Sequence, residues 1–249
     1  MDSNFNITTI VKGKQIYEGK AKTLFSTNNP NLIIQYFKDD ATAFNGVKKE
    51  TIQNKGELNN FISEAIMKQM EIAKIDNHFI ARISNREQIV KKLNIIPLEV
   101  IVRNVVAGSL VKKFALTEGV EITKPIVEIC FKDDSLGDPM INEDHAINLL
   151  GLVNKEQMLE IREKAFAINN VLRSFFLKAS LILVDFKVEF GFDDLQNIIL
   201  ADEISPDSCR LWDLKTKTKL DKDVFRYNLG DISKSYQEIA DRIGVKICK

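Results

Sequence analysis

The sequence is poor in the residues that mark fibrous, mucin-like and disordered proteins. Only 11 of its 249 residues are glycine and 5 are proline, whereas 45% are hydrophobic. This composition excludes a collagen-like or wholly disordered chain, and the length allows a sizeable core. The 35 basic and 35 acidic residues leave no net charge. This balance excludes binding to nucleic acid by bulk charge, because such domains are usually strongly basic, but it leaves room for a local basic pocket that binds a small anion.

Cysteine and long apolar runs are also scarce. Cys130, Cys209 and Cys248 are odd in number and lack metal-ligand spacing, so we expect reduced thiols rather than disulfides or a metal site. The densest apolar stretch, 181–184, falls far short of the roughly 18 residues of a membrane-spanning helix. The N-terminus lacks the basic and apolar segments of a signal peptide. We therefore expect a soluble, cytoplasmic protein without a membrane partner.

Hydrophobic patterning predicts strands in the first third of the chain and amphipathic helices further on. The predicted strands lie at 15–27, 31–37, 95–105, 181–191 and 197–203, the last two as a hairpin. The predicted helices lie at 58–73, 158–179 and 232–243, with Asn154 as an N-cap of the second. Strands and helices without strict alternation favour an α+β fold. We expect a smaller β-rich N-terminal lobe, residues 1–95, and a larger α+β C-terminal lobe, residues 96–249.

The strand at 181–191 carries the most informative charges. Strand side chains alternate between faces, so Asp185, Lys187 and Glu189 share one face. The hairpin partner ends in Asp202 and Glu203, which brings a second carboxylate towards Glu189. Carboxylates beside an ammonium suit a divalent cation or a phosphate. A solvated strand face with local ion pairs explains the same pattern.

A second candidate is the segment Tyr17-Glu18-Gly19-Lys20-Ala21-Lys22. It is not a Walker A motif, but its small residues let backbone N–H groups approach a phosphate. If Lys20 and Lys22 stand two apart on a strand, both ammonium groups point the same way. The alternative is a hairpin with two exposed lysines.

Three arginines lie near predicted strand ends or turns. Arg103 precedes Ala107-Gly108-Ser109, and Arg210 and Arg226 follow polar turns. Arginine in such places is suited to bind phosphate or carboxylate with two parallel hydrogen bonds. Surface ion pairs are the alternative.

Taken together and in this order, the motifs resemble those of the SAICAR synthetase family. The matching segments are YEGKAKTLF (17–25), DDATAFNG (39–46), VRNVVAGSLVKK (102–113), DPMINEDHA (138–146), LVDFKVEFG (183–191), LADEISPDSCRLWD (200–213) and DKDVFRYNLG (221–230). The resemblance covers almost the whole chain. Residues 1–13 extend ahead of the family pattern, and Tyr227-Asn228 stand where a basic residue is often expected.

The resemblance implies an ATP-dependent carbon–nitrogen ligase of purine (IMP) biosynthesis. Such enzymes join the carboxylate of CAIR, an aminoimidazole ribonucleotide, to the amine of L-aspartate, giving SAICAR, ADP and phosphate through an acyl phosphate. ATP is a co-substrate, Mg²⁺ the expected cofactor, and a homodimer the expected assembly. The expected fold is α+β, with ATP in the cleft between two lobes.

The resemblance also assigns roles to individual residues. It implies that Lys20, Lys22 and Lys187 bind ATP phosphates and that the backbone around Ile95 contacts adenine. Glu189 and Asp202 would hold magnesium, which makes Lys187, Glu189 and Asp202 the expected catalytic residues. The residues expected to shape the ribonucleotide pocket are Arg103, Ser109, Asp138, Arg210 and Arg226.

Two other functional classes remain open. A small-molecule kinase on a similar scaffold would also use ATP, although the protein-kinase motifs are absent: Lys187 follows Asp185-Phe186 where a glycine would be needed. A non-catalytic nucleotide-binding module would be expected to have lost Lys187, Glu189 or Asp202, and all three are present.

Overall fold

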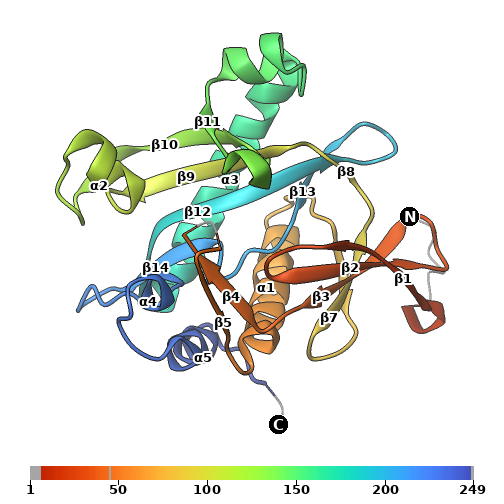
Figure 1. Ribbon diagram of the computed structural model, residues 1–249, viewed down its shortest axis with the longest axis horizontal. Helices are drawn as coiled ribbons and strands as arrows, with labels where there is room; N and C mark the ends of the chain where they lie inside the picture. Colours follow the sequence, from red (N-terminus) through yellow and green to blue (C-terminus); the bar gives the residue numbers. More distant parts are fainter. Residues whose placement is uncertain (1–6, 45, 248–249) are drawn as a thin grey trace.

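Short apolar runs separated by turns build an antiparallel sheet from the first third of the chain. The computed structural model describes residues 7–44 and 46–247 (Figure 1). The sheet has the order β1-β2-β3-β7-β6. Its strands are β1 (Lys12–Glu18), β2 (Lys22–Thr27), β3 (Leu32–Phe37), β6 (Phe79–Arg82) and β7 (Glu87–Lys91). The single strand predicted over 15–27 is wrong in one respect: a turn at 19–21, closed by the Gly19 N–H on the Lys22 carbonyl at 2.8 Å, divides it into β1 and β2.

The second sheet is centred on β12 (Leu181–Phe192), whose two faces are almost entirely buried. The main strand order is β11-β10-β9-β12-β13, and β14 and β8 also pair with β12. The other strands are β8 (Asn94–Ile95), β9 (Leu98–Val105), β10 (Glu121–Phe131), β11 (Met140–Ile141), β13 (Ile198–Ala201) and β14 (Cys209–Asp213). The predicted hairpin of 181–191 with 197–203 is confirmed, because β12 and β13 pair antiparallel with Glu189 opposite Ala201.

Three long amphipathic helices form where the apolar stripes predict them. These are α1 (Lys55–Ile72), α3 (Lys155–Lys178) and α5 (Ile232–Arg242); shorter helices are α2 (Ser109–Phe114) and α4 (Asp223–Arg226). Asn154 caps α3 as predicted, in a reciprocal capping box with Gln157. No helix in the described part of the chain has the length and apolar character needed to cross a bilayer.

The α1 helix links the two sheets. It contacts β3 and β6 on one side and α3 and α5 on the other (Figure 1). Its buried side chains belong to one core with β9, β12, α3 and α5. The α+β fold class is confirmed, whereas the division at residue 95 stays a prediction, since this core draws on residues from both sides of it.

A small hairpin forms a third, separate sheet. It is formed by β4 (Asp40–Ala43) and β5 (Lys48–Thr51), and β4 contacts α4. Cys130 and Cys209 are buried free thiols, as expected, and Cys248 lies outside the described residues.

Candidate functional site

Two cavities adjoin where the first sheet faces β9 and β12. The arginine cavity, about 440 Å³, is lined by Arg103, Ser109, Arg210 and Arg226 among others. The apolar cavity, about 490 Å³, has an apolar lining that includes Leu24, Ile33, Val90 and Ile95. The residues that line both cavities are Lys20, Ala21, Glu99, Lys187 and Glu203. An elongated ligand with an apolar and an anionic end therefore has room on both sides of Lys187.

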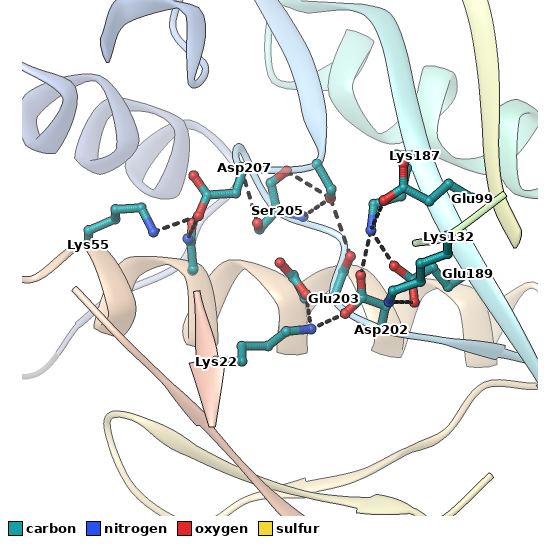
Figure 2. A network of polar contacts seen from close by, with 12 residues as sticks. Lys22, Lys55, Glu99, Lys132, Lys187, Glu189, Asp202, Glu203, Ser205 and Asp207 are labelled. Carbon is teal, nitrogen blue, oxygen red and sulfur yellow. Dashed lines mark hydrogen bonds and ion pairs between the residues drawn. The ribbon is translucent and has the colours of Figure 1, made fainter. Parts of the chain in front are cut away.

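Lys187 lies at the centre of a cluster of carboxylates. Its Nζ donates to Glu189 Oε1 at 2.6 Å and to Asp202 Oδ2 at 2.8 Å, and lies 3.6 Å from Glu99 Oε1. Figure 2 shows these side chains converging from β12, β9 and the segment after β13, with Lys132 on the other side of Glu189. The predicted shared face of β12 therefore forms part of the site, and the solvated-face alternative is wrong for Glu189, which is 3% exposed.

Ion pairing governs the ionisation of this cluster. Burial alone lowers the pKa of Lys187, but the charges of Asp202, Glu189 and Glu99 outweigh it and raise this pKa well above the usual value. Burial raises the pKa of Asp202, yet Lys187 and Lys22 bring it well below its usual value. Burial and the adjacent Asp202 charge raise the pKa of Glu203 to about 7. Lys187 is therefore a permanent cation in the site.

The two lysines of the Gly19 turn approach the site from the first sheet, by different routes. Lys22, at the start of β2, contacts both Asp202 and Glu203 (Figure 2). Lys20 lies in the turn itself and pairs with Asp134 at 2.6 Å. The expectation that both lysines stand on one strand is wrong, because the turn ends β1 before Lys20. Both nevertheless line the apolar cavity.

Ile95 and Asp138 also line the apolar cavity. Ile95 lies in β8, opposite Gly191 of β12. Asp138 accepts a hydrogen bond from the Asp133 N–H at 3.0 Å. Asp138 is not among the residues that line the arginine cavity, where the resemblance leads us to expect it.

The three predicted arginines, Arg103, Arg210 and Arg226, line one cavity. Arg103, only 4% exposed, donates to Asp185 Oδ2 at 3.0 Å and to Ser109 Oγ at 3.0 Å. Arg210 donates to the same Asp185 oxygen at 2.8 Å. The surface ion-pair alternative is therefore wrong for Arg103. Arg226 lines the same cavity, and its Nη1 donates to Asp223 Oδ1 at 2.7 Å.

A buried ion pair supports the loop between β13 and β14. Lys55 and Asp207 are almost fully buried, with Nζ 2.6 Å from Oδ2. Asp207 also accepts from Asn59 at 2.8 Å and from the Tyr236 hydroxyl at 2.7 Å. Figure 2 shows this pair beside Ser205, in the loop that carries Glu203 into the site. Lys55, Asn59 and Tyr236 thereby fix the loop from α1 and α5.

Several residues of the site were missed by sequence reasoning. Glu99 interrupts an apolar segment and Lys132 follows one, and a charge in such a place is the signal available in the sequence. Asp223 stands in the charged run Asp221-Lys222-Asp223, which carries no such signal. Lys48 of β5 donates to Asn228 Oδ1 at 2.6 Å. Lys48 thus places a cation beside Asn228, where the resemblance leads us to expect a basic residue.

Glu189 and Asp202 offer the hard oxygen ligands that Mg²⁺ prefers. The described residues contain no group of three or more His, Cys, Asp or Glu side chains arranged for a metal. Two carboxylates nevertheless suit Mg²⁺, which usually binds one or two carboxylates together with phosphate oxygens and water. The site is thus suited to bind a phosphate ester with Mg²⁺ on one side and an anion on the other.

Comparison with known proteins shows the same family along almost the whole chain. A family model for SAICAR synthetase matches residues 15–243. The chain is 52% identical over 235 residues to the phosphoribosylaminoimidazole-succinocarboxamide synthase of Bacillus subtilis (strain 168), covering 94% of this chain and 97% of that relative.

Solved structures of the same family have the same fold as this chain. The synthase of Ehrlichia chaffeensis, 44% identical, superposes with a TM-score of 0.92 and covers 94% of this chain and 100% of that one. A SAICAR synthetase in complex with ADP, 48% identical, has a TM-score of 0.90 and covers 94% of this chain and 99% of its own.

Proposed function

Because the chain belongs to the SAICAR synthetase family, whose members are ATP-dependent ligases of purine biosynthesis, we propose that it joins CAIR to L-aspartate with ATP as co-substrate. The observation that carries the proposal is the meeting of the apolar and arginine cavities at Lys187. ATP would occupy the apolar cavity, whose apolar side chains suit an adenine ring. Binding of the nucleotide itself is supported by a 48% identical SAICAR synthetase that was solved in complex with ADP. The anionic CAIR would occupy the arginine cavity, and its carboxylate would meet the γ-phosphoryl group near Lys187.

The chemistry explains why ATP is needed. A carboxylate resists attack by an amine because it is anionic and has no good leaving group. In the proposed reaction a CAIR carboxylate oxygen attacks the γ-phosphorus, the bond to the β-phosphate oxygen breaks, and ADP leaves. The aspartate amine then attacks the acyl carbon, loses a proton, and expels inorganic phosphate. Most of the catalysis lies in positioning and charge neutralisation.

The residues have distinct proposed roles in these steps. Lys187 neutralises the transferred phosphoryl group and the reacting carboxylate. Lys20 and Lys22 bind the phosphates of ATP, and the backbone at Ile95 contacts adenine. Ser109 and the arginines of the arginine cavity bind the ribonucleotide. Asp138 lines the apolar cavity. Its role in binding the ribonucleotide stays a prediction.

Glu189 and Asp202 would hold Mg²⁺ together with ATP. When bound, the ion would neutralise charge on the phosphate oxygens. The lysines that now pair with these carboxylates would contact phosphate oxygens instead. A homodimer and a cytoplasmic location belong to the same proposal and follow from the family resemblance.

Isotope transfer tests the proposed reaction. With CAIR labelled by ¹⁸O in its carboxylate, we expect one labelled oxygen in each phosphate released, because the acyl C–O bond breaks when the amine attacks. Phosphate free of label, in a reaction that forms SAICAR, would contradict the acyl phosphate. A phosphorylated CAIR as the final product in the presence of aspartate would favour a kinase.

A further inference from the structure

One carboxylate oxygen holds two arginines of the arginine cavity. Asp185 is 4% exposed, and its Oδ2 accepts from Arg103 Nη1 at 3.0 Å and from Arg210 Nη1 at 2.8 Å. These residues come from β12, β9 and β14, which pair side by side, with Asp185 opposite both Arg103 and Arg210. The sheet register therefore fixes this contact.

A second carboxylate holds two arginines through two different oxygens. Asp223 is 1% exposed; its Oδ2 accepts from Arg210 Nε at 3.0 Å and its Oδ1 from Arg226 Nη1 at 2.7 Å. Asp223 is itself anchored, because its N–H donates to Asp221 Oδ1 at 2.8 Å. Asp185 and Asp223 therefore bind two different nitrogens of the Arg210 guanidinium.

The backbone closes a third side of Arg210. Gly108 has a φ of +56°, in the region that favours glycine. A Cβ at this position would lie 2.7 Å from Arg210 Nη2 and 2.9 Å from its Cζ. The guanidinium therefore packs directly on the glycine, in space that any side chain at 108 would occupy.

We infer that Asp185 and Asp223 are positioning residues, which hold the three arginines so that their remaining N–H groups face the anionic substrate. The inference rests on the proposed function. Among the described residues no hydrogen bond uses Nη2 of Arg210 or of Arg226. These donors are available to a phosphate or carboxylate in the cavity. A guanidinium fixed beforehand binds more tightly because less rotamer freedom is lost on binding.

The two carboxylates respond differently to asparagine. Asp185→Asn can turn its single amide oxygen to both arginines, because both bind one oxygen in the native protein. Asp223→Asn cannot, since its NH₂ group must then face either Arg210 or Arg226, donor against donor. The isosteric substitution should therefore disturb the arginines much more at position 223 than at position 185.

Steady-state kinetics of four full-length proteins test this difference. They are the wild type, Asp223→Asn, Asp185→Asn and the control Glu64→Gln. Glu64 also binds two cations through two oxygens, Arg82 at 2.5 Å and Lys68 at 2.8 Å, but lines neither cavity. For Asp223→Asn we expect the KM for CAIR to rise at least about tenfold, with the KM for ATP unchanged. For Asp185→Asn we expect a smaller rise, and for Glu64→Gln none.

Gly108→Ala is the second variant should Asp223→Asn fail to fold, and it should raise the KM for CAIR without changing that for ATP. The inference is overturned if the KM for CAIR is unchanged in the folded variants, if Asp185→Asn raises it as much as Asp223→Asn, or if the constants for ATP and CAIR rise equally. Those results, with an active wild type, leave the proposed function intact. A wild type without CAIR-dependent turnover overturns both.

Discussion

Glu189 shows most clearly how a single side chain is prepared for its proposed role. It is buried at the end of a strand face, with Lys187 on one oxygen and Lys132 on the other. The two ammonium groups place positive charge beside both oxygens of the buried carboxylate. Carboxylate oxygens are the hard ligands that Mg²⁺ prefers.

Replacing Glu189 with glutamine removes a charged hard ligand while keeping the size of the side chain. If Glu189 holds magnesium, turnover should fall by about 100-fold or more, as for other positioned electrostatic groups. The magnesium concentration for half-maximal rate should rise as well. Kinetics with magnesium varied, alongside Glu64→Gln as control, measure both. A folded Glu189→Gln enzyme with the activity and magnesium dependence of the wild type would mean that the metal lies elsewhere.

The sequence predicts the site residues of β12 better than their partners on other strands. Alternation along β12 is enough to place Asp185, Lys187 and Glu189 on one face. Their partners come from other strands, such as Glu99 of β9 and Lys132 at the end of β10. Strand pairing over long sequence separations decides those contacts, and a single sequence does not reveal it.

At the scale of elements, the loop between β13 and β14 depends on a buried charge pair. Lys55 begins α1, and Asp207 lies in the loop between Glu203 and Arg210. Burial raises the pKa of Asp207, but Lys55 outweighs it and brings this pKa below its usual value. The pair therefore contributes stability above the unfolded-state pKa of Asp, and this contribution is lost as the pH falls through the folded-state value.

Asp207→Asn should destabilise the fold, because it leaves the Lys55 ammonium buried without a countercharge. Removing one partner of a buried pair costs about 3–5 kcal/mol. Urea unfolding should show this difference, constant between about pH 5 and 8, since Asp207 stays ionised there. The double variant Lys55→Met/Asp207→Asn should be less destabilised than the sum of the single variants. A loss below about 1 kcal/mol for Asp207→Asn would assign the loop's order to other contacts.

Element prediction succeeded where a pattern is local. The apolar stripe and the Asn154 cap identify α3, and Asn28-Asn29-Pro30 marks the turn between β2 and β3. At 19–21 the single predicted strand is wrong, whereas the turn of the alternative hairpin is confirmed, because β1 and β2 pair antiparallel across it. The position of α1 against both sheets is a result of packing and has no local signal.

At the scale of the whole molecule, the site is formed by the meeting of two sheets. The first supplies Lys22 and the turn that carries Lys20, and the second supplies Lys187, Glu189, Arg103 and Arg210. Elements from both ends of the chain line the two cavities, from the Gly19 turn to α4. The α+β class was predictable from the sequence, and the family from its motifs. The joining of the cavities at Lys187 required the structure.

We propose that ATP, CAIR and aspartate react where the two cavities meet at Lys187. The most direct test is release of ADP, measured with CAIR, aspartate and magnesium supplied singly, in pairs and together. We predict sustained release only when all three accompany ATP, because aspartate must displace the phosphate for turnover to continue. Equal release without CAIR, or sustained release with CAIR but no aspartate, would contradict a ligase reaction at this site.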